Sequence, residues 1–304
     1  MPVRVMMGKF PAIIFIVCAC VASSCGRGAR LPEDLSRAES LLDSRPDSSL
    51  IILDSASYSE SSGRYLYASY CLLRTFAEYN AYKPGIDEGM MNVGVDYFLK
   101  YGNRDRRAQA YYLRAVVRED NKSGNQADWA NDLLLATKEV KGSGNHMLAA
   151  MINLRYAVVL NDRKWYDASL PYLEKGLEEA EKAGSLAFQV TALINLSHRA
   201  LFLGDENKDY SEAIEYANRA AEISKGDDND YARALYNLGA CYSRNGQFDK
   251  ALECASTAVR AQERLFREGK RKARVRYAVL ADAFRKMNIP DSALFYAAKE
   301  MEAS

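Results

Sequence analysis

The chain repeats one short pattern at a fixed interval. Leucine stands at four positions that are 42 residues apart: Leu154, Leu196, Leu238 and Leu280. Three of these leucines follow an asparagine, at Asn153, Asn195 and Asn237. A period held over four copies predicts an array of stacked units, because each unit buries its apolar face only against its neighbours.

The copy around Leu238 indicates how each unit folds. Small and large residues recur there at helical spacing, and the pattern breaks once at Asn245-Gly246. Gly239 and Ala251 leave room for two helix backbones to approach closely, while Tyr242 fills space beside that contact. A glycine at 246 allows the left-handed backbone that ends many helices. The copy therefore predicts two antiparallel helices joined by a tight turn.

These residues resemble the tetratricopeptide repeat (TPR), although the usual TPR unit is shorter, at about 34 residues. The resemblance covers residues 31–304 and is strongest from 148 onward. It implies an all-α fold, a right-handed TPR superhelix that is an α-solenoid of antiparallel helix pairs. We expect an N-terminal capping helical hairpin at 31–57 and an array of about six helix pairs at 64–304.

The N-terminus carries an export pattern. Arg4 and Lys9 precede a short apolar stretch at 10–21, as in secretory signals. Small residues then precede Cys25, which resembles the lipidation site of bacterial lipoproteins. We expect a lipoprotein signal peptide at 1–24 and a tether at 25–30, with Cys25 lipidated. Cys20 is an alternative lipidation site, and a plain secreted protein is another reading.

As a whole the chain resembles a TPR lipoprotein of a diderm bacterium, similar to the sensor halves of membrane-bound TPR regulators. The resemblance implies a lipid anchor in a bacterial membrane, the outer membrane being favoured, with the array facing the periplasm. It also implies binding of a protein or peptide, of unknown identity, in a concave groove. Without residues 1–24 the chain has 39 basic and 40 acidic residues, so no nucleic-acid partner is expected.

The sequence has few residues of the types that enzymes use for catalysis. It has two histidines, His146 and His198, and none of the metal, nucleotide or nucleophile motifs. We therefore predict no enzyme activity, no cofactor and no metal site. Cys71, Cys241 and Cys254 are expected to be free, buried thiols.

Asparagine is the residue type with the clearest candidate role in binding. If the repeated leucines point into the core, Asn153, Asn195 and Asn237 point towards the inner face, where an amide offers both a donor and an acceptor to a peptide. Arg233, four residues before Asn237, is the one basic residue at its place in the pattern. An alternative is that the asparagines only bond one unit to the next. Other residues expected to line the same groove are Tyr156, His198, Tyr236 and Arg244.

The predicted function is a non-catalytic, membrane-tethered TPR scaffold or receptor. Two alternatives stay open: an outer-membrane assembly accessory lipoprotein, and a glycan- or nutrient-capture lipoprotein on a TPR-like frame. The basic run from Arg264 to Arg276 is interpreted as a solvated linker face.

Overall fold

The computed structural model describes residues 30–269 and 275–303, and within them it contains helices and no strand. The signal segment, Cys20 and Cys25 lie outside these residues. The helices are α1 Glu33–Leu41, α2 Pro46–Ser55, α3 Arg64–Asn80, α4 Glu88–Tyr101, α5 Arg104–Asp120, α6 Gln126–Val140, α7 His146–Asp162, α8 Tyr166–Lys182, α9 Leu186–Asn207, α10 Ser211–Ile223, α11 Asp228–Arg244, α12 Phe248–Arg267, α13 Ala278–Lys286 and α14 Pro290–Ala303, with a short 3-10 turn, η1, at Glu60–Ser62.

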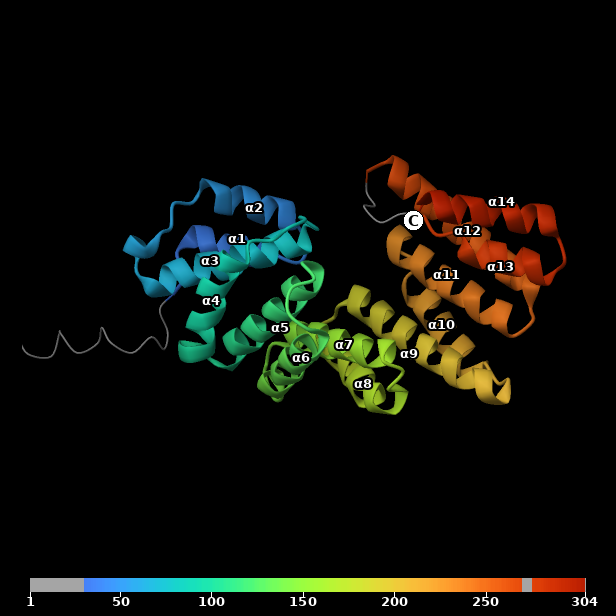
Figure 1. Cartoon of the computed structure of the whole chain (residues 1–304), viewed down its shortest axis with the longest axis horizontal. Helices are drawn as coiled ribbons and strands as arrows, with labels where there is room; N and C mark the ends of the chain where they lie inside the picture. The colour runs from blue at the N-terminus through green and yellow to red at the C-terminus, as the bar shows by residue number, and fades with distance from the viewer. Residues whose placement is uncertain (1–29, 270–274, 304) are drawn as a thin grey trace, which may run out of the picture.

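Successive helices pair with one another, and the pairs follow each other along an arc from α1 to α14 (Figure 1). The odd-numbered helices α1 to α13 form a continuous series in which each contacts the next odd-numbered helix. The even-numbered helices make no such contacts among the described residues. Because the odd-numbered helices lie closer together, they form the inner side of the curve.

The repeated pattern around Leu238 folds as two closely packed helices, α11 and α12. A β-carbon added at Gly239 would lie 3.2 Å from the carbonyl oxygen of Ala251 and 3.3 Å from the amide nitrogen of Ala255. Such distances are tighter than ordinary side-chain contacts, so the absent side chain allows the backbones to approach. Gly246 has φ +75° and lies in the turn, which confirms the predicted left-handed backbone there.

The 42-residue period has a direct structural counterpart. Arg233 on α11 donates a hydrogen bond from Nη2 to Oγ1 of Thr191 on α9, at 3.1 Å, and the two residues are 42 positions apart. Equivalent positions of successive inner helices therefore lie side by side, as the stacking of similar units requires.

Polar side chains also reinforce the stack. Nδ2 of Asn121 donates to the carbonyl oxygen of Ile86 at 2.9 Å, and Arg107 forms two hydrogen bonds with the carboxylate of Glu139. Within the described residues, α9 alone is long and apolar enough to cross a membrane. Half of the relevant window is buried inside the array, as in the core helix of a solenoid.

The three cysteines that the structure describes are free thiols. Cys71 and Cys241 are buried, and Cys254 is half-buried rather than fully buried as expected. The Sγ atom of Cys241 lies 3.3 Å from Oγ of Ser197 on α9. Burial raises the pKa of Cys71 and of Cys241 to about 11, so both thiols are protonated at neutral pH.

Candidate functional site

A hollow of about 230 Å³ opens on the inner helices of the C-terminal half. Its walls combine side chains from α9, α11 and α12 with the segment that leads into α13. The lining residues are Ile194, Asn195, His198, Arg233, Tyr236, Asn237, Gln262 and Arg276. Five of the residues predicted from the sequence meet here: Asn195, His198, Arg233, Tyr236 and Asn237.

Helical spacing explains why these residues meet. Asn195 and His198 are three residues apart on α9, and Arg233 and Asn237 are four apart on α11, so each pair lies on one helix face. The two helices contact each other directly. The face of each helix that points to the inside of the arc therefore supplies one wall.

Arg233 is held at the edge of the hollow by two hydrogen bonds. Its Nη1 donates to Oδ1 of Asp230 at 2.7 Å, and its Nη2 donates to Thr191 on the neighbouring inner helix. The second bond fixes the guanidinium across the boundary between two units. A fixed guanidinium loses little conformational entropy when it binds a carboxylate.

Arg276 supplies a second cation, from the segment before α13. Its guanidinium lies over the ring of Tyr236, 4.8 Å from the centroid, which is a cation–π contact. Its backbone amide donates to Oε1 of Gln262 at 3.0 Å, and Gln262 is almost completely buried. The buried amide of Gln262 therefore anchors the segment that carries Arg276.

Asn237 connects the hollow to the core. Its Nδ2 donates to Oγ of Ser197 on α9 at 2.8 Å, and that hydroxyl donates in turn to the carbonyl oxygen of Ala213 on α10, at 2.9 Å. Only 2% of Asn237 is exposed. Its Oδ1 is buried and accepts no hydrogen bond of good geometry from a described residue. Asn237 thus joins two units and also leaves one unused acceptor at the wall of the hollow.

Asn195 has a different environment. It is half-buried, and its Nδ2 donates to the carbonyl oxygen of Thr191 on its own helix, at 2.8 Å. Asn153 does the same with Ala149, at 2.7 Å. Among the three repeated asparagines, only Asn237 donates a hydrogen bond to another unit, so the predicted inter-unit bonding does not run along the whole series.

The charges of the hollow favour an anionic group. Arg233 and Arg276 line it, and no carboxylate is among the lining residues. Burial lowers the pKa of His198, and the nearby charge of Arg276 lowers it further, although a contact with Asn237 opposes both effects. The His198 side chain is exposed to solvent, and the protein atoms around it still disfavour the charged form of the ring. His198 is therefore neutral at pH 7 and acts as a hydrogen-bonding group there.

Three predicted groove residues lie elsewhere. Asn153 is buried on α7, and Tyr156 packs edge to face against Tyr172 with their centroids 4.7 Å apart. Arg244 forms an ion pair with Asp205, Nη1 to Oδ2 at 2.6 Å. None of the three lines the hollow. Arg244 lies away from the hollow because α9 extends to Asn207, and this extension brings Asp205 next to the end of α11, where Arg244 pairs with it.

The sequence did not indicate three of the lining residues: Ile194, Gln262 and Arg276. Gln262 lies near the end of α12, and Arg276 follows the part of the linker at 270–274, which lies outside the described residues. The earlier units have no linker of this kind, so the 42-residue period gave no information about either residue. Arg276 is exposed, in agreement with the interpretation of this run as a solvated linker face, and its guanidinium also lies over the ring of Tyr236.

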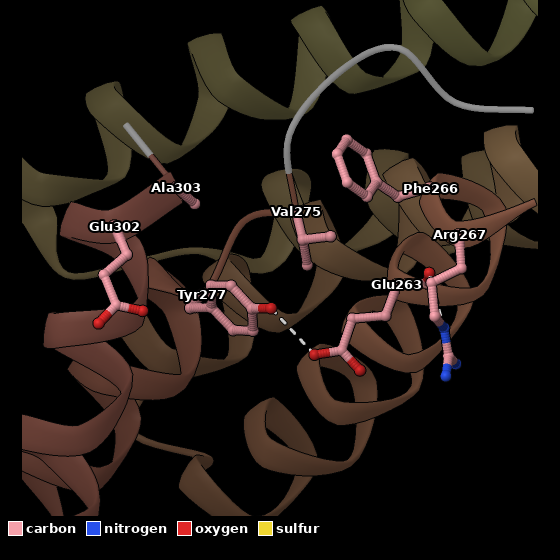
Figure 2. Close-up of a pocket in the computed structure, with 7 residues that line it drawn as sticks. All are labelled: Glu263, Phe266, Arg267, Val275, Tyr277, Glu302 and Ala303. Carbon is pink, nitrogen blue, oxygen red and sulfur yellow. Dashed lines mark hydrogen bonds between the residues drawn. The ribbon is translucent and has the colours of Figure 1, made fainter. Parts of the chain in front are cut away.

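A larger hollow of about 550 Å³ lies at the end of the array, between α12 and α14. Its walls include Phe266, Val275 and Tyr277, and Oη of Tyr277 donates to Oε1 of Glu263 at 2.9 Å (Figure 2). None of the residues predicted to bind a peptide lies there, and its two carboxylates, Glu263 and Glu302, outnumber its one arginine, Arg267, so the hollow does not favour an anion. Within the ranges that the structure describes, no group of three or more His, Cys, Asp or Glu residues is arranged to hold a metal ion.

Comparison with known proteins supports this description of the fold. Two overlapping stretches, residues 196–264 and 230–303, match the family model for the tetratricopeptide repeat. The fold is a TPR-like α-solenoid. The matched residues include all those that line the hollow except Ile194 and Asn195. The sequence has no significant match among curated proteins.

Several solved structures share the TPR-like fold. A Rap protein complexed with Competence and Sporulation Factor aligns with a TM-score of 0.66 and 14% identity, over 89% of this chain and 75% of that chain. The apo form of RapI aligns with a TM-score of 0.63 and 16% identity, over 88% and 74% of the two chains. Aspartyl phosphate phosphatase F from Bacillus subtilis aligns with a TM-score of 0.56 and 13% identity, over 90% and 85%. At these identities the likeness shows the fold alone.

Proposed function

We propose that this protein is a non-catalytic scaffold or receptor that binds a protein or peptide segment carrying a carboxylate in the hollow between α9 and α11. The observation that carries the proposal is the set of lining groups. Two arginines, two asparagine amides and a neutral histidine surround the hollow, and no carboxylate lines it; Arg233 is paired with Asp230 outside the lining, while Arg276 lies over the ring of Tyr236. Arginine matches the planar geometry of a carboxylate, and amides match a peptide backbone. One neighbour of the fold was crystallised with a bound factor, Competence and Sporulation Factor.

A photo-crosslinking experiment tests this function. The probe is a photoreactive amino acid placed at Asn195, which lines the hollow and is only half-buried. We expect a discrete crosslinked polypeptide from membrane extracts, and its loss in Arg276→Ala. Arg244→Ala is the matched control, because that arginine is paired with Asp205 outside the hollow. The absence of any crosslinked polypeptide, or equal yields in the two arginine variants, contradicts the proposal.

We further propose that lipidation at Cys25 tethers the array to a bacterial membrane, the outer membrane being favoured, facing the periplasm. The support is the sequence pattern, in which small residues precede the cysteine after a short apolar stretch. Metabolic labelling with palmitate should mark the wild type and Cys20→Ala but not Cys25→Ala. Cys25→Ala should also leave the membrane fraction. Labelling that persists in Cys25→Ala and disappears in Cys20→Ala would move the anchor to Cys20.

A further inference from the structure

A second hollow, on α3 and α4 and remote in sequence from the first, has a different chemistry. Its volume is about 550 Å³. Because α3 and α4 are antiparallel, the beginning of α3 and the end of α4 meet at one end of the pair, and η1 closes that end. The lining residues are Glu60, Arg64, Tyr67, Ala68, Val93, Asp96, Tyr97, Lys100 and Tyr101.

The aromatic side of this hollow is a connected group of tyrosines from α3 and α4. The ring centroids of Tyr97 and Tyr101 are 5.1 Å apart, and Tyr97 also contacts Tyr65 at 6.4 Å. Val93 and Tyr101 stay exposed, at 38% and 53% of their surface, although they share the helix face of Tyr97. An apolar face that is held rigidly but left open to solvent suits a ligand with an apolar face of its own.

The polar side has four charged side chains: Glu60, Arg64, Asp96 and Lys100. None of them forms an ion pair with another described residue. The Nζ atom of Lys100 lies 5.2 Å from the Tyr101 ring centroid, which places the ammonium above the aromatic surface. Two carboxylates and two cations give no net charge, so neither a polyanion nor a polycation is favoured. They do supply strong acceptors and strong donors at one place.

The hollow is also built on rigid elements. A β-carbon at Gly94 would lie 3.0 Å from the carbonyl oxygen of Ala68, so α3 and α4 touch beneath the hollow. The turn that carries Glu60 is fixed by a capping box between Ser59 and Ser62. The walls therefore need little rearrangement to bind a ligand, which reduces the entropic cost of binding.

We infer that the hollow on α3 and α4 binds a neutral saccharide. A sugar ring has a face of C–H groups, which packs on tyrosine, and a rim of hydroxyls that both donate and accept hydrogen bonds. The tyrosines offer the first surface, and the balanced charged groups offer partners for the second. The inference does not depend on the peptide-binding function proposed for the other hollow. The inference assigns a site to glycan binding, which the sequence analysis left open as an alternative function.

The test uses the whole protein and a panel of soluble neutral oligosaccharides: α-glucan, β-glucan, xylan, mannan and chitin fragments. Binding is measured by isothermal titration calorimetry. We expect at least one member to bind, and Asp96→Asn and Tyr101→Ala to weaken it by about tenfold or more. Both side chains are exposed, so thermal melting should stay at the wild-type value.

The matched controls are Asp167→Asn and Phe295→Ala, which change exposed residues on α8 and α14. They should alter the affinity by less than about twofold. The inference is overturned if no member of the panel binds, or if the hollow variants bind as tightly as the controls. Displacement of the sugar by a proline-rich peptide would also overturn it, because aromatic grooves bind such peptides. A failure here leaves the crosslinking at Asn195 unaffected, so the two proposals fail separately.

Discussion

Replacing Asn195 and Asn237 by alanine should give two different results, although both follow the same sequence pattern. Asn237 is 2% exposed and bonds to Ser197 in the preceding unit, so its loss removes a buried inter-unit hydrogen bond and leaves a small cavity. A buried hydrogen bond contributes about 1 kcal/mol, and the cavity adds to the cost. We expect Asn237→Ala to lower the free energy of unfolding by about 1–2 kcal/mol.

Asn195 is half-buried and bonds only to the carbonyl oxygen of Thr191 in its own helix. Alanine is also the better helix former. We therefore expect Asn195→Ala to change the free energy of unfolding by less than about 0.5 kcal/mol. In thermal melts followed by circular dichroism, Asn237→Ala should melt about 2–6 °C below the wild type, and Asn195→Ala within about 1–2 °C of it.

A double-mutant cycle with Ser197→Ala identifies the cause. If the hydrogen bond between Asn237 and Ser197 carries the loss, Asn237→Ala should cost about 1 kcal/mol less in the Ser197→Ala background. Denaturant titration measures the four free energies. Equal losses for Asn195→Ala and Asn237→Ala, or a cost at Asn237 that is the same in both backgrounds, would refute the reasoning.

Three further predictions concern the turn, the histidine and the thiols. Gly246→Ala should lower the free energy of unfolding by about 1 kcal/mol, because φ at this position is +75° and only the backbone conformation, not a neighbouring atom, opposes a β-carbon. The control in the same melting assay is Gly226→Ala, where φ is not positive and no neighbouring atom lies within contact distance. The pKa of His198 is lowered in the folded protein, whereas the unfolded value is about 6.5, so the unfolded chain binds the proton at a higher pH. The free energy of unfolding should therefore fall as the pH drops below about 6.5. In denaturant titrations at several pH values, His198→Gln should not show that loss. Cys71 and Cys241 are buried, and the pKa of each thiol is raised to about 11. At mildly alkaline pH, iodoacetamide should therefore label neither thiol in the folded protein and both in urea, as measured by mass spectrometry. Labelling of Cys241 in the folded protein would contradict its burial.

The repeat pattern predicted the fold well because it depends on sizes and spacing. Gly239, Ala251 and Gly246 act as expected, since a close helix contact and a left-handed turn both depend on the lack of a side chain or on a small one. The same spacing placed five groove residues together. It did not predict that Asn237 bonds to Ser197, because a helical period gives the face of a residue and not its partner on another helix.

Two kinds of irregularity limited the prediction of the site. The extension of α9 to Asn207 brings Asp205 to Arg244 and removes that arginine from the hollow. Arg276 reaches the hollow from the linker that precedes α13, and no earlier unit has an equivalent linker. Such features lie outside the period, so their positions depend on tertiary packing.

The uneven spacing of inner and outer helices gives the array a mechanical asymmetry. Each odd-numbered helix already contacts the next odd-numbered helix, whereas the even-numbered helices do not contact one another. Bending the arc further would compress the packed contacts between inner helices, which resist compression strongly, while straightening it would separate these contacts and stretch hydrogen bonds such as that between Asn237 and Ser197. The hollow between α9 and α11 spans one of these inner contacts. A ligand bound there would act as a brace between two units, and an extending force on the array would widen the hollow and release the ligand.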